Sequence, residues 1–289
     1  MRETAMPEPE STATADELHV LHSGGENSLR SLIDPWDRAC GDIAYIPYYF
    51  YAIRHHQGLV LIDCGAHPDL ATDPVRRLGE QAQFSDIVMD VGDDVVGCLR
   101  RAGLEPADVT DIVITHLHFD HCGGLELLPH ARVHVQQAEW DFAADPPVYQ
   151  QLAYIPADWA QVQRWMFHQG EHDLFGDRAI TLFPTPGHTP GHQSVLVRLA
   201  GRTVLCVGDA AYHHTKMAER KLPGYLWNPD ALIASWELIE RLRDRHDAEL
   251  LFSHYPGPDE LAQSQAPSTA ASRRSPMSPA AANQNGHAS

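Results

Sequence analysis

The chain has 289 residues, of which 43% are apolar, and its formal net charge is -18, from 21 Lys and Arg against 39 Asp and Glu. It is long enough and apolar enough to bury a sizeable core, as one large domain or two small ones. Its charge would repel a phosphate backbone and an anionic membrane surface, so we expect neither nucleic acid nor a membrane as a partner.

The two ends of the chain have the composition of tails. Residues 1–15 and 262–289 are rich in small and polar residues and contain almost no large apolar side chain, which predicts disorder. The N-terminal sequence lacks the apolar core of a signal peptide, and no stretch reaches the roughly 18 apolar residues of a membrane span. The five cysteines form no CxxC pair, which favours reduced thiols. We therefore expect a cytoplasmic protein with one folded unit over 16–261; the sequence leaves open whether it is a monomer or a homodimer.

Short β-branched runs alternate with helical patterns along this unit. The runs predict strands over 48–53, 59–63, 111–115, 132–136, 180–185, 194–199, 203–209 and 249–254. Apolar residues at helical spacing predict helices over 91–102 and 229–245, the second with Asn228 as its N-cap. The segment 141–177 is irregular, and we interpret it as an insertion or as a cover over a site. Mixed strands and helices favour an α/β fold in which helices cover sheets.

Four of the predicted strands end in metal-capable side chains. Ligand sites in α/β folds gather at the carboxyl ends of strands, so these side chains are expected to converge. Imidazoles and carboxylates without a thiolate suit zinc and also tolerate cobalt, manganese or iron. The strand over 111–115 leads into HLHFDH, the strand over 180–185 leads into PGHTPGH, and the last two end in GD and SH, which together supply His116, His118, Asp120, His121, His188 or His192, Asp209 and His254.

Several of these assignments stay open on spacing alone. Nothing in PGHTPGH chooses between its two histidines. Asp63, at the end of the strand over 59–63, is interpreted as a carboxylate that orients ligands, because metal sites need such carboxylates. Cys122 is interpreted as buried filler, since the paired Cys spacing of zinc sites is absent. Isolated histidines are usually surface or core residues, so no role is assigned to His55, His56, His213 and His214.

The blocks LIDCGAHP, HLHFDHCGG, TPGHTPGHQS and GDAAY occur in this order and resemble those of the N-acyl homoserine lactonases in the metallo-β-lactamase superfamily. The resemblance covers nearly all of 16–261, and it implies an αββα sandwich with two zinc ions at its edge. One departure is visible, because the family commonly has an acidic residue after the last histidine and this chain has Tyr255. The resemblance assigns one ion to His116, His118 and His188, and the other to Asp120, His121 and His254, with Asp209 between them.

The activity that the resemblance implies is metal-dependent opening of a lactone ring. The substrates would be N-acyl homoserine lactones, opened in quorum quenching by a hydroxide held between the two ions. Asp120 would orient this nucleophile and pass its proton to the leaving oxygen. By the same resemblance Tyr212 would hydrogen-bond the substrate carbonyl, and Phe119 would line the pocket for the acyl chain. Without the resemblance, Tyr212 would be interpreted as a packing residue.

Other functions share the metal motif. A lactonase for another small lactone, such as a pyridoxal-derived one, shares the DAAY block. A glyoxalase II-like thioesterase would use the same metals. Proteins of that type are longer and have a basic, helical region after the last ligand, whereas this chain is low in complexity there. The net charge disfavours a tRNA-processing nuclease, and the missing signal peptide disfavours an exported β-lactamase. A metal-stabilised scaffold without turnover is also disfavoured, because structural zinc sites are usually closed and four-coordinate.

Overall fold

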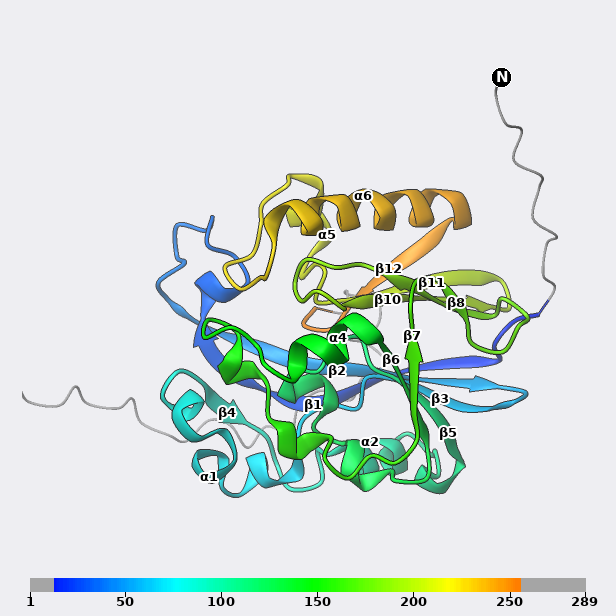
Figure 1. Cartoon of the computed structure of the whole chain (residues 1–289), viewed down its shortest axis with the longest axis horizontal. Coiled ribbons are helices and arrows are strands. Elements are labelled where there is room, and N and C mark those ends of the chain that lie inside the picture. Colours follow the sequence, from blue (N-terminus) through cyan, green and yellow to red (C-terminus); the bar gives the residue numbers. More distant parts are fainter. Residues whose placement is uncertain (1–12, 256–289) are drawn as a thin grey trace, which may run out of the picture.

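Two β-sheets face each other in the computed structural model, which describes residues 13–255 (Figure 1). Within these residues one sheet has the strand order β4-β1-β2-β3-β5-β6-β7 and the other has the order β12-β11-β10-β9-β8. Pairing is parallel from β3 through β7 and between β11 and β12, and antiparallel elsewhere. The strands are β1 (Glu17–Leu29), β2 (Ile43–His55), β3 (Gly58–Ile62), β4 (Asp86–Val88), β5 (Val109–Val113), β6 (Arg132–Gln136), β7 (Trp165–His168), β8 (His172–Asp173), β9 (Ile180–Pro184), β10 (Gln193–Leu199), β11 (Arg202–Gly208) and β12 (Ala248–Phe252).

Apolar side chains fill the space between the two sheets and the space under the helices on their outer faces. Ile62 of the seven-stranded sheet and Val195 of the five-stranded sheet belong to one buried cluster, which lies between the sheets. Helix α6 (Pro229–His246) lies on the outer side of the five-stranded sheet (Figure 1), where Trp236 packs in a cluster with Leu205. This helix places its apolar residues at helical spacing, so one face is buried and the other is solvated.

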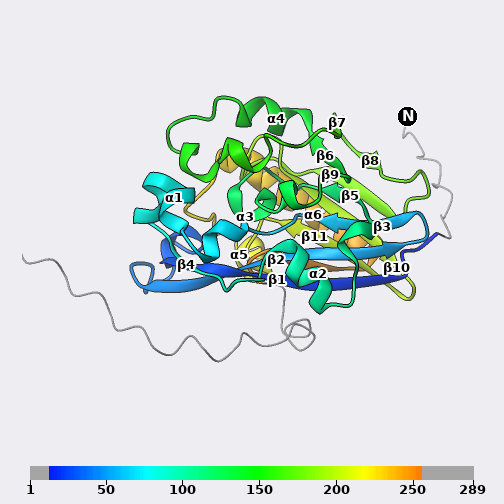
Figure 2. The same cartoon turned by 90° about the horizontal axis from the view of Figure 1, so that it is seen from below.

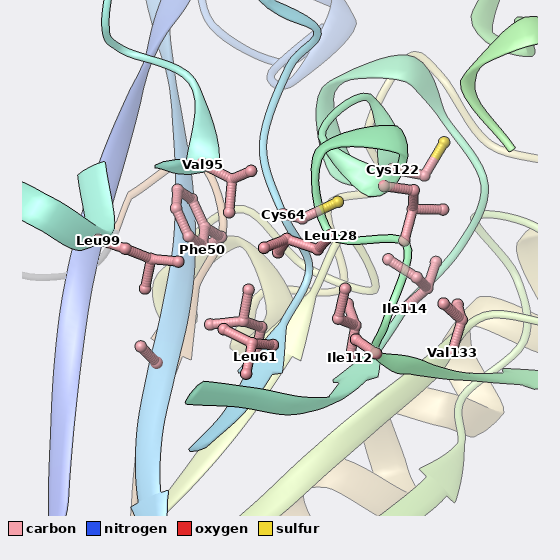
Figure 3. Packing of buried hydrophobic residues seen from close by; sticks show 14 of the residues in the cluster. Phe50, Leu61, Cys64, Val95, Leu99, Ile112, Ile114, Cys122, Leu128 and Val133 are labelled. Carbon is pink, nitrogen blue, oxygen red and sulfur yellow. The ribbon is translucent and has the colours of Figure 1, made fainter. Parts of the chain in front are cut away.

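The opposite outer face, on the seven-stranded sheet, carries a cluster of its own. Val95 and Leu99 of α2 (Val95–Arg101) pack there with Phe50 and Leu61, as Figure 3 shows. In Figure 2 α2 lies in front of the strands and α6 behind them, so the layers follow the order helix, sheet, sheet, helix. The predicted αββα sandwich is therefore confirmed.

The remaining α-helices are α1 (Pro74–Leu78), α3 (Phe119–Cys122), α4 (Gln137–Ala143) and α5 (His214–Ala218), with short 3-10 turns at Arg30–Leu32, Pro68–Ala71, Gly79–Gln83, Pro106–Asp108, Leu125–Leu127, Gln151–Ala153 and Pro156–Asp158.

The predicted elements are present, with shifts at their ends. Every predicted strand overlaps a strand of the structure, and the one over 132–136 matches β6. The helix α6 begins as predicted, with the Asn228 side chain accepting a hydrogen bond from the Ala231 N–H. The helix predicted over 91–102 is shorter, because the Asp94 carboxylate caps it by accepting from the Val96 N–H. The strands β1, β4, β7 and β8 were not predicted.

The proposed tails lie outside the described residues, apart from positions 13–15. Ala15 is fully buried between the sheets, and its N–H donates to the carbonyl of Arg198 at 2.7 Å. The folded unit expected over 16–261 is described up to residue 255. Among residues 13–255 the structure contains no helix that is both long enough and apolar enough to cross a lipid bilayer.

Candidate metal centre

The metal-capable residues predicted from the sequence meet at one edge of the sandwich. His116, His118 and His121 follow β5 of one sheet, whereas Asp209 follows β11 and His254 follows β12 of the other. All of these side chains are buried. The ring centres of His121 and His254 are 5.6 Å apart, although the two residues come from different sheets. The structure thus brings together what the sequence places at separate strand ends.

Three imidazoles form a first group of potential ligands. His118 Nδ1 lies 2.9 Å from His116 Nε2 and 3.1 Å from His188 Nε2. The three ring planes cross at 74° to 86°, and one nitrogen of each ring lies within 4.8 Å of the other two, so one cation could contact all three rings. His188 Nε2 is also 3.5 Å from Asp209 Oδ2, which places this carboxylate at the border of the group.

A second group shares Asp209 with the first. His121 Nε2 lies 3.4 Å from Asp120 Oδ2 and 3.4 Å from Asp209 Oδ1. His254 Nε2 lies 3.5 Å from Asp120 Oδ2 and 3.2 Å from Asp209 Oδ2. The Asp209 carboxylate therefore faces both groups.

Hydrogen bonds on the outer side of the rings decide which nitrogens face the centre. The Pro47 carbonyl can only accept, so His254 donates to it from Nδ1 at 2.7 Å. His121 Nδ1 lies 2.8 Å from the Asp63 carboxylate, which also accepts from the Thr115 hydroxyl at 2.9 Å. Each of these two rings then turns its Nε2 toward the centre, as the nitrogen that is available to bind a cation. Asp63 takes the orienting role expected from the sequence, and a backbone carbonyl orients His254.

The donors of both groups fit two cations. His121 Nε2 and Asp209 Oδ1 are buried without a hydrogen-bond partner, and they face each other. Burial lowers the pKa of His188 to about 4, and burial together with neighbouring imidazoles lowers the pKa of His118, so these rings are neutral at pH 7. Polar atoms that are buried without hydrogen-bond partners are unfavourable, and divalent cations bound between them would remove this cost.

Residues 46–254 match the family model described as the metallo-beta-lactamase superfamily. The chain belongs to this superfamily. It is 35% identical over 220 residues to the N-acyl homoserine lactonase AttM of Rhizobium radiobacter, an alignment covering 73% of this chain and 82% of the relative. It is 34% identical over 248 residues to the AttM lactonase of Azorhizobium caulinodans, covering 83% and 93%. A solved N-acyl homoserine lactone hydrolase with N-hexanoyl-L-homoserine at its metal centre matches with a TM-score of 0.75 at 23% identity, over 83% of this chain and 94% of that one. The chain is a metal-dependent hydrolase of this lactonase type.

Tyr212 of this superfamily member lies beside the metal-capable groups. Its hydroxyl donates to Asp209 Oδ2 at 3.2 Å, and its ring centre is 5.4 Å from that of His254. Phe119 lies one side chain further away, in a buried apolar cluster with Leu70 and Tyr48. The ring of Tyr48 contacts Phe119 edge-on at 6.1 Å and His254 at 5.9 Å. Both residues singled out by the resemblance therefore adjoin the candidate site.

The two histidines of PGHTPGH differ in what their rings contact. His188 belongs to the first group, whereas both nitrogens of His192 already have partners. His192 Nε2 accepts from the backbone N–H of Asp209 at 3.0 Å, and its Nδ1 lies 2.9 Å from the Thr185 hydroxyl. His192 therefore holds the backbone at Asp209 and does not face the centre of the first group.

Replacing His188 with Ala in this hydrolase is expected to lower its metal content, because a nitrogen of the first group is lost. Replacing His192 with Ala should leave the metal content nearly intact. The backbone N–H of Asp209 then loses its buried partner, which costs roughly 1–3 kcal/mol of folding free energy. Elemental analysis and thermal denaturation of the two variants check this pair. Metal loss that followed His192 instead of His188 would show that the assignment is wrong.

A further histidine cluster does not have the geometry of the first two groups. His134, His168 and His172 bring ring nitrogens within 4.8 Å of one another. However, the planes of His134 and His168 are inclined by only 4°, and those of His168 and His172 by 23°. Lone pairs lie in the ring planes, so stacked rings do not point them at one atom. His134 instead bonds to Asp111 Oδ1 and to His168, at 2.8 and 3.0 Å.

Glu139 is a residue of the site that the sequence did not reveal. It lies on α4 and is fully buried, and its carboxylate accepts hydrogen bonds from the loops around His118 and His188. In QAEWDFAA nothing distinguishes it from an exposed helical Glu.

The irregular segment 141–177 also reaches the site, since the Gln150 side chain donates to the carbonyl of His188 at 3.3 Å. Of the two interpretations of this segment, a cover over a site agrees with its position.

Proposed function

We propose that this hydrolase opens the ring of N-acyl homoserine lactones. The proposal rests on one arrangement: a phenol hydroxyl, that of Tyr212, stands next to a carboxylate, that of Asp209, which faces both groups of metal-capable side chains. A carbonyl oxygen placed there would meet a hydrogen-bond donor and a polarising centre together. The similarity to proteins named as N-acyl homoserine lactonases supports this substrate class.

Two zinc ions fit the proposed site, and cobalt, manganese or iron would suit the same nitrogen and oxygen donors. When bound, such ions lower the pKa of a shared water toward about 7 and polarise a carbonyl. The donors proposed for the first ion are His116, His118 and His188, those for the second are Asp120, His121 and His254, and Asp209 is proposed to be shared.

The side chains would divide the remaining work of the reaction. Asp120, at the partly exposed side of the second group, is proposed to orient the attacking water and to carry its proton to the ring oxygen that leaves. Burial, with Asp209 and Asp120 nearby, raises the pKa of Tyr212 well above its ordinary value. The phenol therefore keeps its proton at neutral pH and can donate to the carbonyl oxygen. We assign Phe119 to the apolar wall for the acyl chain, which its packing with Tyr48 supports.

The substrate class can be tested with a panel of compounds. The zinc-loaded protein is given N-acyl homoserine lactones of several chain lengths, a pyridoxal-derived lactone, a glutathione thioester and a β-lactam. We expect the highest kcat/KM for an N-acyl homoserine lactone. A higher value for the pyridoxal-derived lactone or for the thioester would replace the proposed substrate, and absence of turnover on every N-acyl homoserine lactone would overturn the proposal.

Changing Tyr212 to Phe tests the proposed electrophile. The variant keeps the ring and its packing but loses the hydroxyl, so metal content should not change. A donor whose bond strengthens as charge develops on the carbonyl oxygen contributes roughly 10–1000-fold in rate, and polarisation of the same oxygen by a metal favours the lower part of that range. The measurement is kcat/KM for a medium-chain N-acyl homoserine lactone at matched metal occupancy. Equal values for wild type and variant would remove Tyr212 from the mechanism.

A further inference from the structure

The Glu139 carboxylate has four hydrogen-bond partners, and all of them are donors. Its Oε1 accepts from the Leu117 N–H and from the Tyr154 hydroxyl, each at 2.9 Å. Its Oε2 accepts from the Thr189 hydroxyl at 2.6 Å and from the Gly191 N–H at 3.2 Å. An ionised carboxylate only accepts, so this set of partners matches it completely.

The two oxygens hold different loops. Leu117 lies between His116 and His118, and Thr189 directly follows His188. One carboxylate therefore joins both chain segments that supply the first group, and it sets the separation between them. His118 Nδ1 and His188 Nε2 are 3.1 Å apart in this arrangement.

The backbone is built for this close approach. A Cβ atom placed on Gly191 would come within 2.0 Å of the Glu139 backbone nitrogen, so no side chain fits at this position while the turn contacts α4. The Tyr154 hydroxyl brings the segment 141–177 to the same carboxylate, and the Tyr154 ring lies edge-on to His118 with a centre distance of 4.7 Å.

The second group is held by other contacts. His121 and His254 are oriented by Asp63 and by the Pro47 carbonyl. None of the hydrogen bonds that Glu139 accepts in the described part of the chain comes from Asp120, His121 or His254. A substitution at Glu139 should therefore change the metal affinity of the first group more than that of the second.

We infer that Glu139 is a positioning residue that sets the metal affinity of the first group, His116, His118 and His188, and leaves that of the second group unchanged. The inference rests on the metal ligands of the proposed function. Glu139 is assigned no contact with substrate. Its carboxylate acts through the backbone of Leu117 and Gly191, which fixes the positions of the neighbouring imidazoles.

Replacing Glu139 with Gln keeps the shape of the side chain but changes one of its two acceptors into a donor. Each carboxylate oxygen of Glu139 receives one backbone N–H, from Leu117 or from Gly191. In either orientation the amide NH2 of Glu139→Gln would face one of these N–H groups, donor against donor, so one loop must move. Side chains that support metal ligands typically contribute 10–100-fold in metal affinity, and we expect a loss of about this size for the first group.

The test measures Zn2+ affinity without any substrate, by competition with a chromogenic chelator. His254→Ala provides a chain in which the first group is the intact one, and His118→Ala provides a chain in which the second group is intact. Glu139→Gln is introduced into each. We expect about 10–100-fold weaker zinc binding in the His254→Ala background and no change in the His118→Ala background. Asp141→Asn, on the exposed face of the same helix, is the matched control and should change neither.

A milder variant covers the case in which Glu139→Gln destabilises the fold. Thr189→Val removes the hydroxyl donor to Oε2 and keeps both backbone bonds, so it should weaken the same group by a smaller factor. Equal losses in both backgrounds, or no loss in either, would overturn the inference while the metal ligands stand. A wild-type chain that bound no zinc would overturn both the proposed ligands and this inference.

Discussion

Removing the metal ions with a chelator is expected to abolish hydrolysis by this protein. The imidazoles of His118 and His188 are neutral, and without a bound metal the side chains at the edge of the sandwich supply no strong nucleophile. Metals contribute several kcal/mol of charge stabilisation to hydrolases, and each 1.4 kcal/mol is tenfold in rate, so we expect a loss of roughly 1000-fold or more. The measurement is kcat/KM for an N-acyl homoserine lactone before and after chelation, with elemental analysis of both samples.

Readdition of zinc to the chelated sample is the control, and it should restore the rate. Purified protein that has not been treated should contain close to two ions per chain, as the two groups around Asp209 predict. A chain that kept its full rate after verified loss of metal would contradict the assignment of a metal-dependent mechanism.

Changing Asp209 to Ala should lower metal content and activity together. Asp209 is the carboxylate that faces both groups, with Oδ1 toward His121 and Oδ2 toward His188 and His254. Its loss removes a ligand from each proposed ion and leaves the positive charges of the two ions less compensated. The expected decrease in kcat/KM is again roughly 1000-fold or more, because the mechanism loses the same charge stabilisation.

Two comparisons make the Asp209 result specific. Asp141→Asn changes an exposed carboxylate on α4 and should leave metal content and rate at the wild-type level. Asp209→Asn keeps the shape of the side chain and one acceptor oxygen, so it should retain more metal than the Ala variant. An Asp209→Ala protein that held two ions with wild-type affinity would refute the bridging position.

The sequence predicts the parts of the site that a short motif encodes. HLHFDH follows an apolar run, so its position at the carboxyl end of a strand was predictable, and so was the α6 helix with its Asn228 cap. The choice between His188 and His192 was not predictable from spacing. Both lie in one turn, and only the path of the backbone decides that His192 bonds to the Asp209 N–H while His188 faces His118.

Residues and strands whose role depends on tertiary contacts could not be predicted from the sequence. Glu139 is fully buried, yet its neighbours along α4 give it the pattern of an ordinary helical acid. The strand β1 was also missed, because Gly24 and Gly25 interrupt its apolar pattern. Its register against β2 shifts between His22 and Gly25, and this irregularity is accommodated only when the partner strand is present.

The metal-capable residues come from both sheets, and this affects how bound metal changes the rates of folding and unfolding. His121 and His254 become neighbours only when the two sheets that carry the strands β5 and β12, far apart in sequence, have packed against each other. The chain entropy lost in closing such long loops must be offset before these contacts stabilise the fold, so we expect the complete pair of groups only late in folding. Ions that bind there stabilise the native state by mass action and should mainly slow unfolding, while the folding rate changes little. Loss of metal would then shorten the lifetime of the folded chain as well as its activity.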